Sequence, residues 1–197
     1  MKAPSWPRRR LLQGGAAWAL LASSAVRLPA AAATFTDVGT LQKAWWPQAE
    51  VGAVSQGLPE PDRLAEALRA QGLRAPKGFQ PQLWRMQSTQ PGPAGASATQ
   101  PLGWLAADRV IGKYDWIDFA VGFAADGAVL GMEVLAYRES HGAEVRQAQW
   151  RAQFKGRKGP QSLRFADDIR NVSGATLSCQ HLTEGVQRLS ALVQLLA

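Results

Sequence analysis

Alternating apolar and polar residues in the C-terminal half of the chain predict a β-hairpin. Apolar side chains occupy every second position from Ile117 to Phe123 and again from Leu130 to Ala136. This is the period of a half-buried strand. Asp126-Gly127 lies between the two runs, and Asp-Gly in that position is a strong hairpin signal. We therefore expect a hairpin over about residues 114–138.

The final part of the chain has the spacing of an amphipathic helix. Its apolar residues recur at alternating intervals of four and three, at Leu182, Val186, Leu189, Val193 and Leu196. Such a stripe lies on one face of a helix and packs against other elements. An earlier strand is expected over residues 104–111, helical structure over 144–154 and a short extended piece over 163–165. This order predicts an α+β fold, a small antiparallel sheet packed by helices.

The N-terminal part of the chain has a weaker pattern. Short helices are expected at residues 36–46 and at residues 61–72, where Pro61 suits the first position of a helix. Residues 87–101 are rich in small and polar residues without periodicity, which indicates a flexible linker or loop. The expected organisation has four parts: an export signal at 1–33, a region of unassigned role at 34–86, the linker or loop at 87–101 and a domain at 102–197.

The first 33 residues have the composition of a bacterial export signal. Arg8-Arg9-Arg10 precedes two leucines, an Ala-rich apolar stretch follows over residues 14–26, and alanines fill positions 30–33. The segment resembles the twin-arginine type, and the apolar stretch is shorter than the roughly 20 residues of a membrane-spanning helix. We expect cleavage near Ala33 and a periplasmic protein, with an uncleaved tether as the alternative.

Charge and composition narrow the possible functions. Residues 1–33 hold five of the basic residues and no acid, so the net charge falls from +7 to +2 without them. The basic character therefore belongs mainly to the signal and gives no support for nucleic-acid binding. With one cysteine, no intrachain disulfide can form, and two histidines give no recognisable metal-ligand cluster.

The turn Ser173-Gly174-Ala175-Thr176 comes immediately before the C-terminal helix. A small polar turn that opens a helix presents free backbone N–H groups and the positive end of the helix dipole, and both favour a phosphate. Thr176 places a hydroxyl where such a phosphate could become covalently attached. The alternative is that Ser173 or Thr176 only caps the helix, which is the common role of these residues there.

Several stretches, in order, resemble the FMN-binding domain family, which includes extracytoplasmic flavoprotein subunits of the sodium-pumping NADH:quinone reductase and Rnf complexes. The resemblance covers roughly residues 102–197. It rests on the hairpin over 114–131, the Glu- and Gly-containing loop over 133–142, the Gln-Phe-x-Gly segment within 150–156 and the Ser-Gly-Ala-Thr motif with the two residues after it.

The resemblance implies a covalent cofactor. In this family the last Thr of the motif carries FMN through a phosphoester, installed by a separate flavin transferase with FAD as donor, so Thr176 is the expected attachment site. The expected cofactor-binding residues are Ser173, Gly174, Ala175, Leu177, Ser178, Tyr137, Glu139, His141, Gly142 and Trp150. Family motifs often carry an acid three residues before the first Ser or Thr of the motif, and Arg170 stands there in this chain. Asp167 and Asp168, slightly upstream, are the candidates to take its place.

The resemblance favours a periplasmic electron carrier that relays electrons between a membrane-bound reductase or redox complex and an extracytoplasmic acceptor. In such a protein the cofactor performs the chemistry, and the protein positions and tunes it. Two alternatives stay open. One is a non-redox module that binds a ligand or a partner and in which the turn only caps the helix. The other is a flavin-dependent reductase with its own substrate.

Overall fold

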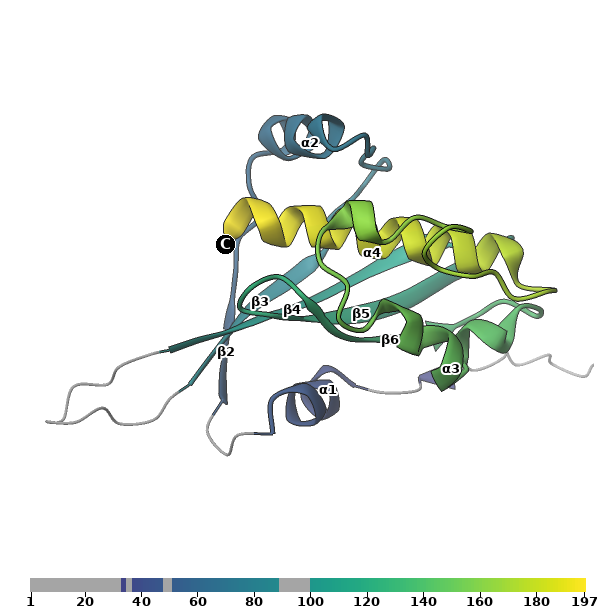
Figure 1. Cartoon of the computed structure of the whole chain (residues 1–197), viewed down its shortest axis with the longest axis horizontal. Coiled ribbons are helices and arrows are strands. Elements are labelled where there is room, and N and C mark those ends of the chain that lie inside the picture. Colours follow the sequence, from purple (N-terminus) through teal and green to yellow (C-terminus); the bar gives the residue numbers. More distant parts are fainter. Residues whose placement is uncertain (1–32, 35–36, 48–50, 89–99) are drawn as a thin grey trace, which may run out of the picture.

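A computed structural model describes residues 33–34, 37–47, 51–88 and 100–197. Its strands form one antiparallel sheet with the order β1-β6-β5-β4-β3-β2 (Figure 1). The strands are β1 (Ala33–Thr34), β2 (Val51–Ser55), β3 (Gln82–Ser88), β4 (Gln100–Ile111), β5 (Trp116–Ala124) and β6 (Val129–Tyr137). Each of the last five strands pairs with its neighbour in sequence, and β1 pairs with β6 at the far edge.

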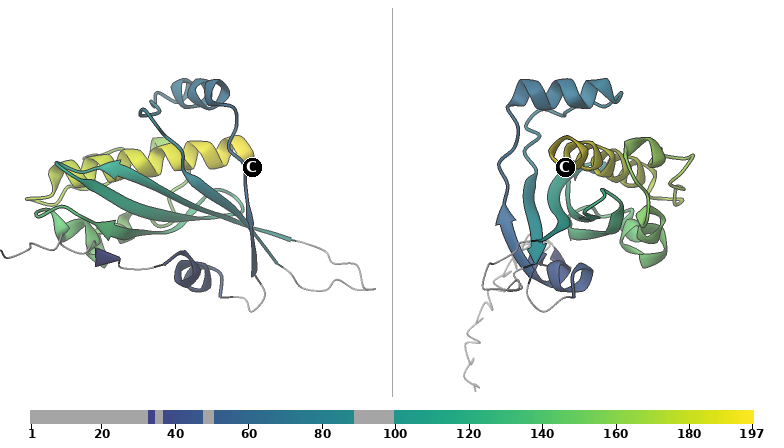
Figure 2. Two further views of the ribbon diagram at one scale, coloured as in Figure 1. Left: turned by 180° about the vertical axis from the view of Figure 1, so that it is seen from behind. Right: turned by 60° about the vertical axis from the view of Figure 1, so that its left-hand side comes forward.

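Helices lie on both faces of this sheet (Figures 1 and 2). The α-helices are α1 (Val38–Trp45), α2 (Pro61–Ala70), α3 (Ala148–Arg151) and α4 (Thr176–Leu196), and the short 3-10 helices are η2 (Ala143–Arg146), η3 (Ala152–Phe154) and η4 (Pro160–Ser162). Helix α4 runs along one face, α2 packs on α4, and α1 covers part of the opposite face. The α+β fold predicted from the sequence is confirmed.

The main hydrophobic core lies between α4 and the sheet. Leu182, Val186 and Leu189 of the predicted stripe are fully buried, and Val193 is 1% exposed. They belong to one cluster with Phe119 and other inward-facing strand residues. Burial of four aliphatic side chains stabilises the packing by roughly 6 kcal/mol or more, at about 1.5–3 kcal/mol each. Helix α4 is therefore held firmly against the sheet along its middle and later turns.

A smaller core on the opposite face holds α1. Leu41 and Trp46 of this segment are buried together with Met86, Leu105 and Ala120. Trp45 lies across Gly122 and Gly131, which are paired in β5 and β6, and a Cβ at either glycine would clash with the indole. The two glycines therefore leave room on this face of the sheet for the Trp45 indole.

The observed elements agree with the sequence pattern where it is regular. Strands β5 and β6 and the turn at Asp126-Gly127 follow the predicted hairpin, and α1, α2 and α4 follow the predicted helices. The helical pattern over 144–154 is divided into η2, α3 and η3, because Gln147 has an extended conformation (φ −66°, ψ 130°) between the first two. The extended piece over 163–165 is reduced to an isolated bridge between Phe165 and Ile169.

The sequence pattern did not predict β2 and β3. Strand β3 lacks regular alternation, since a register shift falls between Met86 and Gln87, and Val54 of the edge strand β2 is exposed. Strand β4 begins at Gln100, four residues before its predicted start, so both ends of the expected linker lie in strands. The rest of that linker, and all of the expected export signal except Ala33, lie outside the described residues. Within the described ranges, no helix combines the length and apolar character that crossing a membrane requires.

Candidate functional site

Helix α4 begins at Thr176 without a side-chain cap. The N-cap position is Ala175 (φ −120°, ψ 20°), and no side chain bonds to the first-turn amides. The first helical bond runs from the Cys179 N–H to the Ala175 carbonyl at 2.8 Å. Among the described residues, the N–H groups of Thr176, Leu177 and Ser178 therefore have no acceptor. The alternative in which Ser173 or Thr176 caps this helix through its side chain is wrong. Three free amides at a helix N-terminus form a binding site for an anion.

The Thr176 hydroxyl is exposed and held in place by one neighbour. The Asn171 side-chain amide donates a hydrogen bond to Thr176 Oγ1 at 3.0 Å. Because the Thr oxygen accepts this bond, its own hydrogen is left available for another acceptor. Gly174 has a left-handed conformation (φ +87°), and no atom of the described chain beyond its two neighbours lies within 4 Å of where a Cβ would be. Glycine therefore forms the turn without strain, and the approach to Thr176 stays open.

A pocket of about 440 Å³ lies beside this turn, with walls from three segments. Its lining consists of Lys113, Tyr114, Glu139, His141, Gly174, Ala175, Thr176, Leu177 and Ser178. The β4–β5 turn, the loop after β6 and the first turn of α4 thus meet here. The volume is in the usual range of small-molecule sites. Seven of the predicted cofactor-binding or attachment residues are brought together in this pocket.

Glu139 holds the turn that forms the wall opposite α4. Its Oε1 accepts hydrogen bonds from the backbone N–H groups of Tyr114 (2.5 Å) and Asp115 (3.0 Å). Tyr114 is 73% exposed, and Lys113 Nζ lies 4.9 Å from the centre of its ring. The Tyr114 hydroxyl raises the pKa of the Lys113 ammonium, which stays charged. Glu139 therefore positions an exposed aromatic ring and a cation at the pocket.

Tyr137 connects the loop after β6 to the start of α4. Its buried hydroxyl donates to the His141 carbonyl at 2.5 Å and lies 3.3 Å from Ser178 Oγ. Burial raises the pKa of this phenol, which stays protonated. Gly142 packs against the same hydroxyl, since a Cβ there would lie 2.8 Å from Tyr137 Oη. Tyr137 and Gly142 are thus placed behind the pocket, where they fix its shape.

Trp150 lies outside the pocket and contacts the chain that leads to Thr176. The side chain is buried, and its indole Nε1–H donates to the Arg170 carbonyl at 2.9 Å. Gln153 Oε1 accepts from the Arg170 N–H at 2.8 Å. The backbone of Arg170 is therefore held on both sides, six residues before Thr176. Trp150 therefore positions the backbone that leads to the turn, and its contact with a cofactor stays a prediction.

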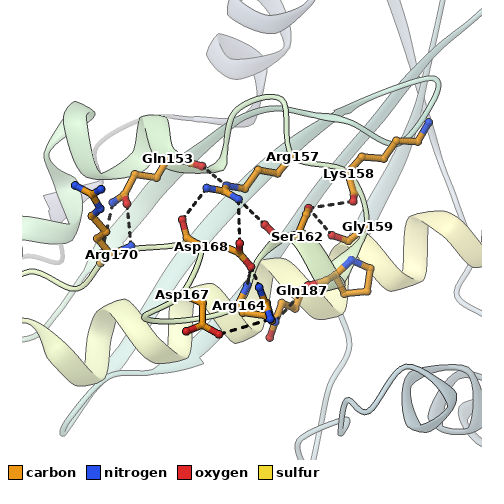
Figure 3. Close-up of polar contacts among 11 residues, drawn as sticks. Gln153, Arg157, Lys158, Gly159, Ser162, Arg164, Asp167, Asp168, Arg170 and Gln187 are labelled. Carbon is orange, nitrogen blue, oxygen red and sulfur yellow. Dashed lines mark hydrogen bonds and ion pairs between the residues drawn. The ribbon is translucent and has the colours of Figure 1, made fainter.

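The two acids upstream of Arg170 are engaged by arginines (Figure 3). Asp168 contacts Arg164 at 3.0 Å and Arg157 at 3.6 Å, and Asp167 lies 3.7 Å from Arg164. The hydrogen bonds from Arg164 lower the pKa of Asp168. Arg157 also donates to three backbone carbonyls, those of Gln153, Ser162 and Asp168. These contacts tie residues 153–168 together, so the acids stabilise the loop before the turn.

Two further groups near the turn have simple surroundings. His141 is exposed at the pocket, and its Nδ1 lies 2.9 Å from Ser140 Oγ. Cys179 is a free, fully buried cysteine whose thiol pKa is raised by burial, so it packs as a small apolar side chain. In the part of the chain that the structure describes, no group of three or more His, Cys, Asp or Glu residues is placed to hold a metal ion.

Sequence reasoning missed Lys113, Tyr114 and Asn171. Lys113 and Tyr114 could have been found from the sequence. They place an aromatic residue beside a lysine in a short turn between strands, where an aromatic side chain is often exposed. Asn171 lies five residues before Thr176, and nothing in the pattern distinguishes it from an ordinary loop residue. Its role depends on the path of the turn.

Comparison with models of known protein families gave a match over residues 112–191. All of the pocket-lining residues fall between positions 113 and 178, within this stretch. A search of curated proteins gave no match to the chain. A match to one family model supports FMN as the cofactor. Residues 112–191 match the model of the FMN-binding domain, and this match confirms the family resemblance predicted from the sequence.

Proposed function

We propose that the protein is an electron carrier whose FMN is esterified to Thr176. The observation that carries the proposal is the first turn of α4, where an exposed hydroxyl lies beside three backbone N–H groups that have no acceptor among the residues the structure describes. The pocket next to it has two exposed apolar side chains, Tyr114 and Leu177, and one lysine. This combination suits a planar ring joined to a phosphate.

The attachment requires an external catalyst. In the proposed reaction the Thr176 oxygen forms a bond to the FMN phosphorus of FAD, the pyrophosphate bond breaks, and AMP leaves. The hydroxyl proton passes to a base of the flavin transferase, because Asn171, which contacts Thr176 Oγ1, is a donor and cannot take it. The resulting phosphodiester keeps one negative charge. The free amides of residues 176–178 and the Lys113 ammonium stabilise that charge.

Bound FMN supplies one- and two-electron chemistry, and the protein positions it. Glu139 holds the β4–β5 turn so that Tyr114 faces the pocket, and Tyr137 holds the loop that carries His141. The pocket is open to the surface, since Tyr114 is 73% exposed and Leu177 is 43% exposed. An exposed ring site suits electron exchange with a protein partner more than turnover of a sequestered substrate.

We further propose that the carrier works in the periplasm. The basic and apolar pattern of residues 1–33 supports export. In that location the carrier relays electrons between a membrane-bound reductase or redox complex and an extracytoplasmic acceptor.

Intact-mass measurement tests the attachment. Wild-type protein co-expressed with a flavin transferase is expected to gain the mass of one FMN less one water and to show a flavin spectrum. Thr176→Ala is expected to lose both, while Ser173→Ala, a neighbouring exposed hydroxyl in the same turn, retains them. Peptide mapping places the added mass on the peptide that contains Thr176.

A stability measurement separates this proposal from a non-redox module. Because the Thr176 side chain does not cap α4, Thr176→Ala is expected to change the free energy of unfolding of unloaded protein by less than the roughly 1 kcal/mol of a lost cap. A wild-type protein that gains no flavin mass, with a loss of about 1 kcal/mol or more in the variant, would favour the module.

A further inference from the structure

Exposed apolar side chains gather beside the pocket, at the end of the β4–β5 hairpin. Among the described residues, five large hydrophobic side chains are exposed, and four of them are Ile111, Tyr114, Trp116 and Leu177. Ile111 and Trp116 are opposite each other in the last pair of β4 and β5, and Tyr114 lies in the turn between them. Tyr114 and Leu177 line the same pocket. The four side chains are therefore neighbours, and a patch of this kind marks an interaction surface.

Cations lie beside both exposed aromatic rings. The Arg109 guanidinium lies 5.9 Å from the centre of the Trp116 ring, and Lys113 Nζ lies 4.9 Å from the centre of the Tyr114 ring. Arg138 donates to the Trp116 carbonyl at 3.2 Å. All three cations are exposed. Aromatic residues and arginine are enriched in protein interfaces and contribute most of their binding energy.

The acids of the same region are turned towards the chain. Asp118 contacts both arginines, at 2.6 Å and 3.5 Å. Asp115 accepts a backbone N–H at 2.7 Å, and Glu139 accepts the two amides of the turn. The three acids equal the three cations in number, but each acid is only half-exposed. A partner that touches this surface therefore meets positively charged N–H donors around an apolar centre.

We propose that a protein partner with carboxylates around an apolar patch docks on this hairpin-end surface, made of the four apolar side chains and the three cations. The proposal rests on the function proposed above, because the surface borders the pocket assigned to the flavin. The exposed rings contact the apolar patch of the partner, and the cations pair with its carboxylates. A partner docked here lies next to the opening of the pocket, where electrons are exchanged.

An NMR titration of the unloaded full chain tests the docking without the flavin. The probe is plastocyanin, a small copper protein that has an acidic patch beside an apolar one. Azurin, a copper protein with an apolar patch but no acidic patch, is the control probe, and both are used in the diamagnetic Cu(I) form. Plastocyanin is expected to shift the signals of residues 109–116 and of Leu177. Azurin is expected to bind about tenfold more weakly, the value of one close charge pair.

Two substitutions assign the binding to this surface. Trp116→Thr removes the exposed ring at a strand position and is expected to weaken plastocyanin binding about tenfold. Arg109→Gln removes one cation and is expected to weaken it about threefold. The matched controls are Val54→Thr, at the fifth exposed hydrophobic residue, on the edge strand β2, and Arg63→Gln, at an exposed arginine of α2. Both controls are expected to keep the affinity of wild type.

Several results would overturn the proposal. They are undetectable binding at millimolar plastocyanin, shifts centred on another part of the chain, equal affinities for the two probes, and equal affinities in wild type and Arg109→Gln. If the spectrum of Trp116→Thr shows that it does not fold, Ile111→Thr at the paired position replaces it. Plastocyanin binding without a gain of flavin mass after co-expression would count against the attachment alone. Flavin mass without plastocyanin binding would count against this surface alone.

Discussion

Asp108 gives the protein a measurable dependence of stability on pH. Burial raises the pKa of this carboxyl to about 6 from its ordinary value of 3.8, and the Arg109 amide and the Arg188 charge offset the burial only in part. The folded state therefore holds the proton more tightly than the unfolded state. The associated stability is fully present below pH 3.8 and is lost as the pH rises through about 6.

The magnitude follows from the difference between the two pKa values. At 1.36 kcal/mol per unit, ionisation of Asp108 costs the folded state about 3 kcal/mol at pH 8. Asp108→Asn keeps the volume and cannot ionise. We therefore expect the unloaded variant to be more stable than wild type by about 3 kcal/mol at pH 8. At pH 4 the expected difference is below about 1 kcal/mol.

Urea unfolding of wild type and Asp108→Asn at a series of pH values measures this difference. The comparison cancels the titration of every other group that the two proteins share. Asp62→Asn, on the exposed surface of α2, controls for the loss of one surface carboxylate. A difference between wild type and Asp108→Asn that stays constant between pH 4 and pH 8 would refute the reasoning.

Two further substitutions test the backbone around the site. Gly142→Ala places a Cβ 2.8 Å from Tyr137 Oη at φ +84°, so we expect a loss of about 2–3 kcal/mol in urea unfolding and a reduced flavin content after co-expression with a transferase. An unchanged unfolding midpoint would contradict this, because it would show that the loop with Gly142 accommodates a Cβ without strain. Ala166→Gly relieves the positive φ of Ala166 (+68°). It is expected to raise the free energy of unfolding by about 0.5 kcal/mol, because relief of left-handed strain exceeds the added entropy of the unfolded chain. A lower midpoint would contradict this.

The regular part of the fold could be predicted from the sequence because periodicity reports burial on one face. The hairpin around Asp126-Gly127 and the stripe of α4 follow directly from it. Strands β2 and β3 could not be predicted in this way. Val54 is exposed on the edge strand, and the register shift after Met86 interrupts the alternation of β3.

At the site, the sequence identified some of the residues but not what their side chains do. The family resemblance identified Glu139 and Trp150, yet both hold backbone groups of other segments, the β4–β5 turn and Arg170. Such roles depend on which segments the fold brings together. Tyr114 and Asn171 become recognisable only when the turn and α4 are placed side by side.

The position of α4 in the chain has a consequence for biosynthesis. Ribosomes complete every strand of the sheet before they reach residues 176–196, and the sheet face that α4 covers stays open to water until then. The first turn of α4 meets the other two walls of the pocket only when this helix lies on the sheet. Under the attachment proposed above, a transferase that recognises this turn would meet only chains on which α4 has docked, and flavin content would then count correctly folded molecules.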